Sequence, residues 1–124
     1  MSTALNDFAS AAYLGVGLYP DTKTASPTGP TVDMISADGP CFAIQQVGEF
    51  SEDTTLAGLI QESADGSSWA AISGATFATV SAANDLQVIR FTRSARYLRY
   101  AATLTGDTPS LEMAVLIGEQ KKTL

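Results

Sequence analysis

The chain has 124 residues, 45% of them hydrophobic and 16% charged, which is the size and composition of one folded domain. It contains no histidine and one cysteine, so histidine-based catalytic triads, histidine metal sites and a disulfide within the chain are excluded. The 13 acidic residues against 7 basic ones give a formal net charge of −6, which argues against a nucleic-acid-binding protein, because such proteins need a basic face.

The segment 1–12 predicts either a short helix or an arm that orders only against a neighbour. Leu5, Phe8 and Ala9 recur at helical spacing, which is typical of one apolar helix face. No basic residue precedes an apolar run here, so we expect no secretory signal and folding in a cytoplasm. No apolar run in the chain is long enough to span a membrane as a helix.

The next two segments predict a strand followed by a long loop. Residues 13–19 are strand-like, and their two glycines suggest a bulge or a close backbone approach. Residues 20–30 contain three prolines and hardly any apolar side chain. We expect this Pro-rich stretch to be the longest loop of the protein, and loops of that length are often functional or mobile.

From residue 31 onward, short apolar runs alternate with turn signals about every ten residues. Residues 41–47 are apolar at both odd and even positions, which predicts a strand buried on both faces. The predicted strands are 32–35, 41–47, 56–63, 69–72, 77–80, 86–92, 96–105 and 111–117, with a turn at 38–40. Alternation places Gln87, Ile89 and Phe91 on one side of 86–92. The other residues predicted to share a side are Leu98, Tyr100, Ala102 and Leu104 in 96–105, and Leu111, Met113, Val115 and Ile117 in 111–117. The pattern predicts an all-β protein with one domain over 1–124, a single antiparallel β-sandwich or jelly roll of about eight strands.

Nothing in the sequence predicts an enzyme, a metal site or a cofactor. The acidic residues Glu49, Glu52 and Asp53 are best explained as a solvated connection between strands, with a weak ion site as the alternative. Cys41 is expected to be a small buried apolar side chain, because no base is available to activate it. The serines likewise lack a histidine partner.

Four arginines, Arg90, Arg93, Arg96 and Arg99, lie within ten positions of one another. One interpretation is that they form ion pairs with the surplus acids, and the other is that they form a docking face, since arginine is enriched at interfaces. In a strand their side chains would not all share one side of the sheet.

Trp69 and Tyr97 are candidates for stacking on a sugar. The more favoured interpretation places Trp69 at the end of the core, because it follows a turn and precedes an apolar run.

Two stretches of the sequence resemble small β-sandwich structural proteins of tailed bacteriophages. They are 61–72 (QESADGSSWAAI) with 74–77 (GATF), and 91–100 (FTRSARYLRY) with 105–109 (TGDTP). The resemblance implies a head decoration (cement) protein, assembled in the host bacterial cytoplasm, which sits on the capsid exterior and stabilises it, often as a trimer. The same two elements also occur in discoidin-like jelly rolls, so the alternative is a carbohydrate-binding module of a phage tail or fibre.

The leading hypothesis is therefore a non-enzymatic virion protein whose partners are the major capsid protein and other copies of itself, a trimer being favoured. No nucleic-acid or membrane partner is expected. The candidate interface residues are Leu5 and Phe8 as apolar anchors, with Arg90, Arg93, Arg96 and Arg99 as polar contacts.

Overall fold

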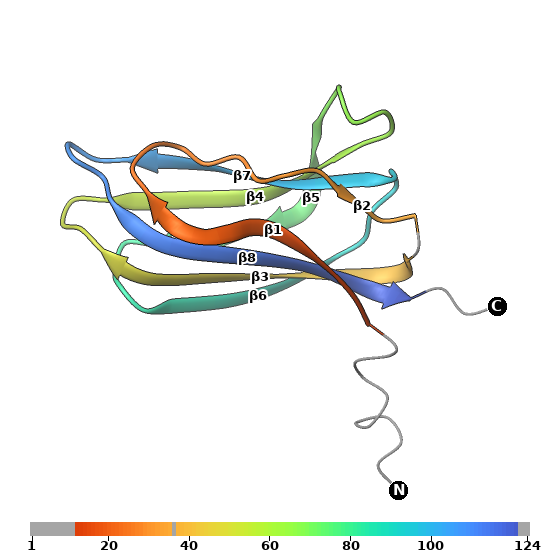
Figure 1. Ribbon diagram of the computed structural model, residues 1–124, viewed down its shortest axis with the longest axis horizontal. Helices are drawn as coiled ribbons and strands as arrows, with labels where there is room; N and C mark the ends of the chain where they lie inside the picture. The colour runs from red at the N-terminus through yellow and green to blue at the C-terminus, as the bar shows by residue number, and fades with distance from the viewer. Residues whose placement is uncertain (1–11, 36, 122–124) are drawn as a thin grey trace, which may run out of the picture.

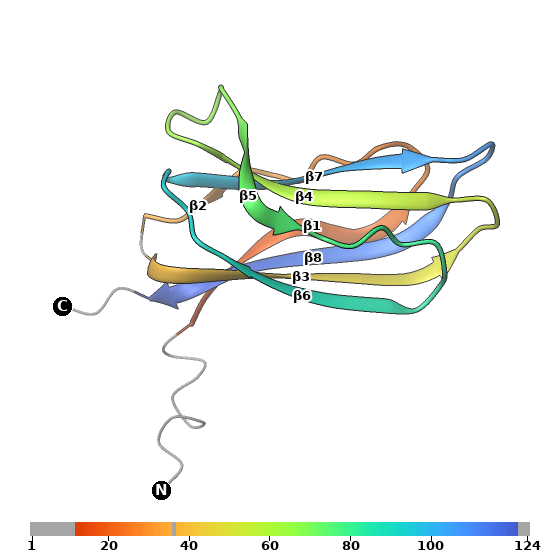
Figure 2. The same cartoon turned by 180° about the vertical axis from the view of Figure 1, so that it is seen from behind.

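The computed structural model describes residues 12–35 and 37–121 and contains two four-stranded antiparallel sheets (Figure 1, Figure 2). The first sheet, in the order β1-β8-β3-β6, contains β1 (Ala12–Lys23), β8 (Leu111–Lys121), β3 (Ala37–Phe50) and β6 (Asp85–Phe91). The second sheet, in the order β2-β7-β4-β5, contains β2 (Val32–Asp33), β7 (Tyr97–Thr105), β4 (Thr55–Ser63) and β5 (Ala70–Thr76). The predicted all-β sandwich is confirmed. The predicted helix or arm, with Leu5 and Phe8, falls on 1–11, outside the described residues.

The core lies between the two sheets and is built by alternation along the strands. In β7, Leu98, Tyr100 and Leu104 are buried, as their shared parity predicted. The four apolar side chains of β8 predicted to share one side are buried as well, namely Leu111, Met113, Val115 and Ile117.

The prediction that 41–47 is buried on both faces is wrong. In β3, Cys41 and Val47 point into the core, whereas Ile44 is half-buried and Gln46 is exposed. The second sheet covers only one side of the first, because the sandwich has two layers. The apolar residues at even positions of this strand therefore lie on the side of the first sheet that the second sheet leaves uncovered.

Several predicted elements also change. β1 continues through Pro20 to Lys23, because it is an edge strand with a register shift between Leu18 and Asp21, where a proline removes no ladder bond. β3 begins at Ala37 and passes the predicted turn at 38–40 as a bulge, with Gly39 at a φ of 94°. The segment 77–80 is not a strand: it makes one isolated bridge, Leu56 to Val80, on its way from the second sheet to the first.

The Pro-rich segment is fastened to the edge of β7. The Gly29 amide donates to the Tyr100 carbonyl at 2.8 Å, and the Ala102 amide donates to the Pro27 carbonyl at 3.0 Å. A Cβ on Gly29 would collide with the Gly17 carbonyl, so only glycine permits this close approach. The segment therefore covers the part of β7 that the two-residue strand β2 leaves unpaired, and natural sheets commonly protect such open edges from pairing with other chains.

Candidate functional site

Arg93 holds one end of the sandwich together from within. Its Nε donates to Glu119 Oε1 at 2.9 Å, and its terminal nitrogens donate to the carbonyl oxygens of Met34, Ala37 and Ala95 at 2.8–3.0 Å. Glu119 is only 1% exposed, so this is a nearly dehydrated ion pair. Arg93 therefore joins Glu119 of β8 to three backbone carbonyls, and the structure gives its guanidinium an internal role.

Cys41 lies beside the same carboxylate. Its thiol donates to Glu119 Oε2 at 3.2 Å. Burial, together with that hydrogen bond, raises the pKa of Cys41 to about 12. The buried and inert role predicted for this residue agrees with its 1% exposure.

Native Cys41 should therefore react with a soluble disulfide reagent at pH 8 on the order of a thousandfold more slowly than a free thiol, because thiolate is the reactive form. The measurement is the rate of colour release with and without urea, and unfolding should restore fast labelling of one thiol per chain. Rapid labelling of the folded protein would show that this end of the sandwich opens readily.

Arg96 and Arg99 also have partners within the chain. Arg96 makes two hydrogen bonds with the Asp33 carboxylate at 2.8 and 2.9 Å, and this contact lowers the pKa of Asp33. Arg96 lies 5.0 Å from the centre of the Tyr97 ring. Arg99 lies 4.5 Å from the centre of the indole ring of Trp69 and donates to Gln61, so it rests on the outer surface of the second sheet.

The location of Trp69 corrects the prediction that it closes the core. It is half-buried at the surface, beneath Arg99, and does not belong to the core cluster. A sugar that stacks on an aromatic ring needs an open face. Arginines of the same chain lie over one face of both Trp69 and Tyr97, which weakens the carbohydrate-binding alternative.

Arg90 differs from the other three arginines. It is exposed on β6, and its side chain has no ion pair or hydrogen bond with any residue in the described part of the chain. The four arginines therefore do not form one patch. Three of them make contacts within the chain, whereas the side chain of Arg90 projects into solvent from the outer side of the first sheet. On that side it is paired with Phe42 of β3.

The outer side of the first sheet carries a continuous apolar surface. Leu86, Val88 and Leu14 are 65%, 59% and 53% exposed. One row crosses all four strands through the partners Val16–Leu116, Leu116–Ile44 and Ile44–Val88. We call this surface the outer apolar face and define it by Leu14, Val16, Ile44, Leu86, Val88 and Leu116.

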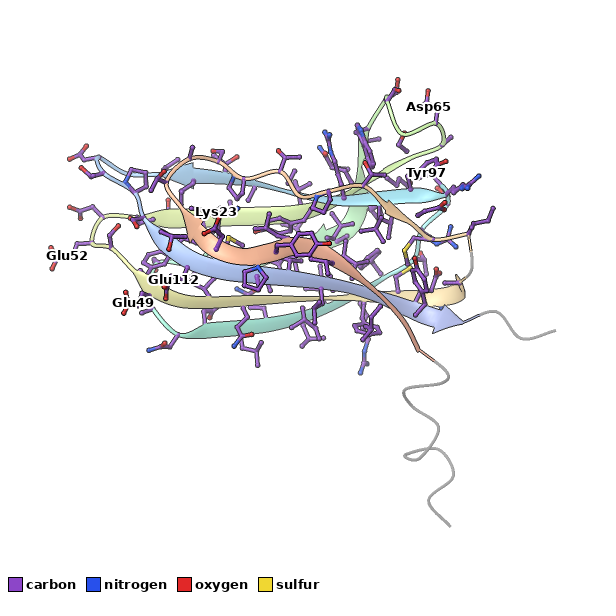
Figure 3. The ribbon with its side chains drawn as sticks, in the orientation of Figure 1. Lys23, Glu49, Glu52, Asp65, Tyr97 and Glu112 are labelled. Atoms are coloured by element: carbon purple, nitrogen blue, oxygen red, sulfur yellow. The ribbon has the colours of Figure 1, made fainter. Side chains whose placement is uncertain are left out.

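A hollow adjoins the outer apolar face at the end of the sheet where β3 finishes and β8 begins. It has a volume of about 470 Å³ and is lined in part by Gln46, Gly48 and Glu112. Lys23, Glu49 and Glu112 gather at this end of the molecule, opposite the end that carries Asp65 and Tyr97 (Figure 3). The border of the face is thus polar and mainly acidic here, and basic at Arg90.

Within 12–35 and 37–121, no three or more cysteine, aspartate or glutamate side chains gather in a way that could hold a metal ion. The same residues include no helix able to cross a membrane.

The sequence contained a signal for the outer apolar face that our interpretation missed. In β6, Gln87, Ile89 and Phe91 were expected to share one side, and they do face inward. Alternation along the strand therefore requires Leu86 and Val88 to face outward. The apolar residues at even positions of 41–47 lie on the same outer surface. Apolar residues on both sides of neighbouring strands indicate either a third layer or a partner.

No protein-family model matches the chain, and no curated protein matches it. Among solved structures, its fold is similar to that of the PBSX exported protein XepA, with a TM-score of 0.62 and 16% identity over 90% of this chain. It is also similar to a chain in the structure of infectious bursal disease virus Gx strain, with a TM-score of 0.53 and 11% identity over 86% of this chain. The chain spans 38% and 31% of the lengths of those two chains. At these identities, the similarity shows a shared fold.

Proposed function

We propose that this protein is a non-enzymatic structural component of a tailed-bacteriophage virion, specifically a head decoration (cement) protein that binds the capsid exterior and stabilises the shell. The observation that carries the proposal is the outer apolar face of the first sheet. The virion setting is supported by the sequence resemblance described above. The similarity of the fold to XepA and to a chain of a virus structure is consistent with it.

The outer apolar face supports an assembly role because its apolar side chains are contiguous and polar groups surround them. Isolated exposed apolar residues are common, but a continuous patch rimmed by polar groups marks an interaction surface. Burying the exposed parts of Leu86 and Val88 alone contributes on the order of 1–2 kcal/mol each to association. The rim of Arg90 on one side and Glu112 on the other gives such a contact a defined orientation.

In this role the protein stabilises the shell through many weakly bound copies and catalyses no reaction. Copies that contact both the shell and one another add buried area at each junction, and linked weak contacts accumulate into strong overall binding. Opening the shell locally then requires these contacts to break together. The assembly interface is expected to contain the outer apolar face, together with Arg90.

The proposal is tested by the copy number of the chain in purified particles. Particles from the strain that encodes it should contain this 12.9 kDa chain at an amount comparable to the major capsid subunit. A few copies per particle would move the protein to the tail or fibre, and complete absence would overturn the virion role.

A variant with Val88→Glu should occupy purified particles about tenfold less than the natural chain at equal concentration, because a carboxylate within the apolar row that crosses the face has to be buried. The matched control is Ile35→Glu, which changes a side chain that is 50% exposed but lies beyond β2 of the second sheet. Equal occupancy by both variants would exclude the face from the interface.

A further inference from the structure

We propose that residues 1–11 of one copy bind across the outer apolar face of a neighbouring copy, so that copies are linked by their N-terminal segments. The inference names the partner of the outer apolar face and rests on the proposed role of that face in assembly.

The face has the dimensions of a docking site for a short segment. Four strands spaced about 4.8 Å apart give it a width of roughly 14 Å. The row Val16–Leu116–Ile44–Val88 crosses that whole width without a charged side chain. Eleven residues span about 16 Å as a helix and about 36 Å when extended. Either conformation can cross from one edge of the sheet to the other.

The segment has the side chains that such a face would bind. Leu5 and Phe8 are large apolar residues three positions apart, which places them on the same side of a helix. Asp7 is the one charged side chain in 1–11. Arg90, at the β6 edge of the face, has no ionic partner in the described part of the chain. An Asp7–Arg90 contact would supply the charge complementarity.

The sequence directs the segment away from its own sheet. β1 is an edge strand, and its first residue, Ala12, pairs with Gln120 near the end of β8. To cover its own face, the chain would have to reverse direction just before Ala12. Glycine, proline, asparagine and aspartate, which favour such a reversal most, are absent from 8–14, and Ser10 is the one turn-favouring residue in it. A neighbouring copy is therefore the favoured acceptor of Leu5 and Phe8.

A contact in which a segment of one copy meets a different surface of the next is head-to-tail. Such contacts close into rings when the rotation between copies allows it. A closed ring satisfies every segment and every face in the assembly.

The first test is the mass of the purified protein by light scattering during gel filtration. The full chain should be an oligomer. A chain that starts at Ala12 and the full-length Val88→Glu variant should each be monomers, while Ile35→Glu should remain an oligomer. Circular dichroism checks that each variant is folded. A full chain that stays monomeric at its highest soluble concentration would overturn the inference, as would a truncated chain that still assembles.

The second test mixes the two monomeric chains. The chain that starts at Ala12 keeps an intact face, and the Val88→Glu chain keeps an intact segment 1–11. Exchange between copies predicts that the mixture forms a one-to-one complex, although neither chain associates alone. A mixture that stays monomeric would show that the segment covers its own face, and would overturn the exchange.

Charge reversal gives an independent check. Arg90→Glu should weaken self-association about tenfold, and adding Asp7→Lys should restore it. Failure of the second change to restore association would remove the Asp7–Arg90 contact.

The particle experiment separates this inference from the proposed function. An exchanged oligomer that is missing from particles would overturn only the virion role. A monomeric chain present at capsid stoichiometry would overturn only the exchange.

Discussion

Replacement of Arg93 by alanine is expected to lower the free energy of unfolding by about 3–5 kcal/mol. The change leaves the Glu119 carboxylate almost fully buried, with the Cys41 thiol as its one remaining hydrogen-bond donor within 12–35 and 37–121. It also removes the donors to the carbonyl oxygens of Met34 and Ala37. Removing one partner of a buried ion pair costs more than the pair contributed, because the remaining charge stays dehydrated.

The measurement is urea unfolding followed by the fluorescence of Trp69, the one tryptophan of the chain. Arg90→Ala is the matched control and should change the free energy of unfolding by less than about 0.5 kcal/mol, because Arg90 is exposed and lacks a described partner. If Arg93→Ala cost no more than the control, water would have to reach Glu119, and the end of the sandwich would be open rather than closed.

This distinction governs how arginine variants are to be interpreted in particle-binding experiments. Loss of binding by an Arg93 variant would report on folding, whereas loss by an Arg90 variant would report on contact. Arg96 and Arg99 are intermediate, because each has a polar partner and an aromatic neighbour within the chain and remains at the surface. The same substitution at the four positions therefore tests different properties.

The sequence predicts the layers of this fold better than its surfaces. Alternation in 97–105 and 111–117 identified the core sides of β7 and β8, since burial on one side leaves a period of two. The same rule is ambiguous at 41–47, where both parities are apolar. Burial under another layer and exposure on a binding face leave the same pattern, and only the arrangement of the sheets distinguishes them.

The partners of the arginines could not be predicted, for a different reason. Glu119 lies 26 positions from Arg93, and the other groups that Arg93 contacts are backbone carbonyls, which have no sequence signature. Likewise, Pro20 reads as a loop residue until β1 is known to be an edge strand. Both depend on long-range strand order, which local patterns do not determine.

A buried polar pair links the two sheets, and replacing its members tests how much this link contributes to stability. Tyr100 of β7 donates its hydroxyl to Gln45 Oε1 of β3 at 2.6 Å, and both residues are fully buried. The amide nitrogen of Gln45 has no hydrogen-bond partner among the residues that the structure describes. Space at this point is limited, because a Cβ on Gly58 would collide with the Tyr100 hydroxyl. The pair is thus half-satisfied in a closely packed position.

Tyr100→Phe should lower the free energy of unfolding by about 1–3 kcal/mol, because it leaves the whole Gln45 amide unpaired. Gln45→Leu should cost a similar amount by leaving the hydroxyl unpaired. The double variant should be close to the natural protein in stability, since two apolar groups replace both partners. The measure is the coupling energy from a double-mutant cycle, and additive losses would show that the two side chains act separately.

Burial of Tyr100 also predicts how the stability of the protein changes at alkaline pH. Burial raises the pKa of Tyr100 above its usual value of 10.0. The neutral hydroxyl is therefore favoured by folding, so its stabilisation is complete below pH 10 and is lost as the pH rises further, where the unfolded chain ionises first. Tyr100→Phe should reduce the loss of stability above pH 10. An unchanged alkaline profile would mean that other groups control it, leaving the hydrogen bond between the sheets as the whole contribution of Tyr100.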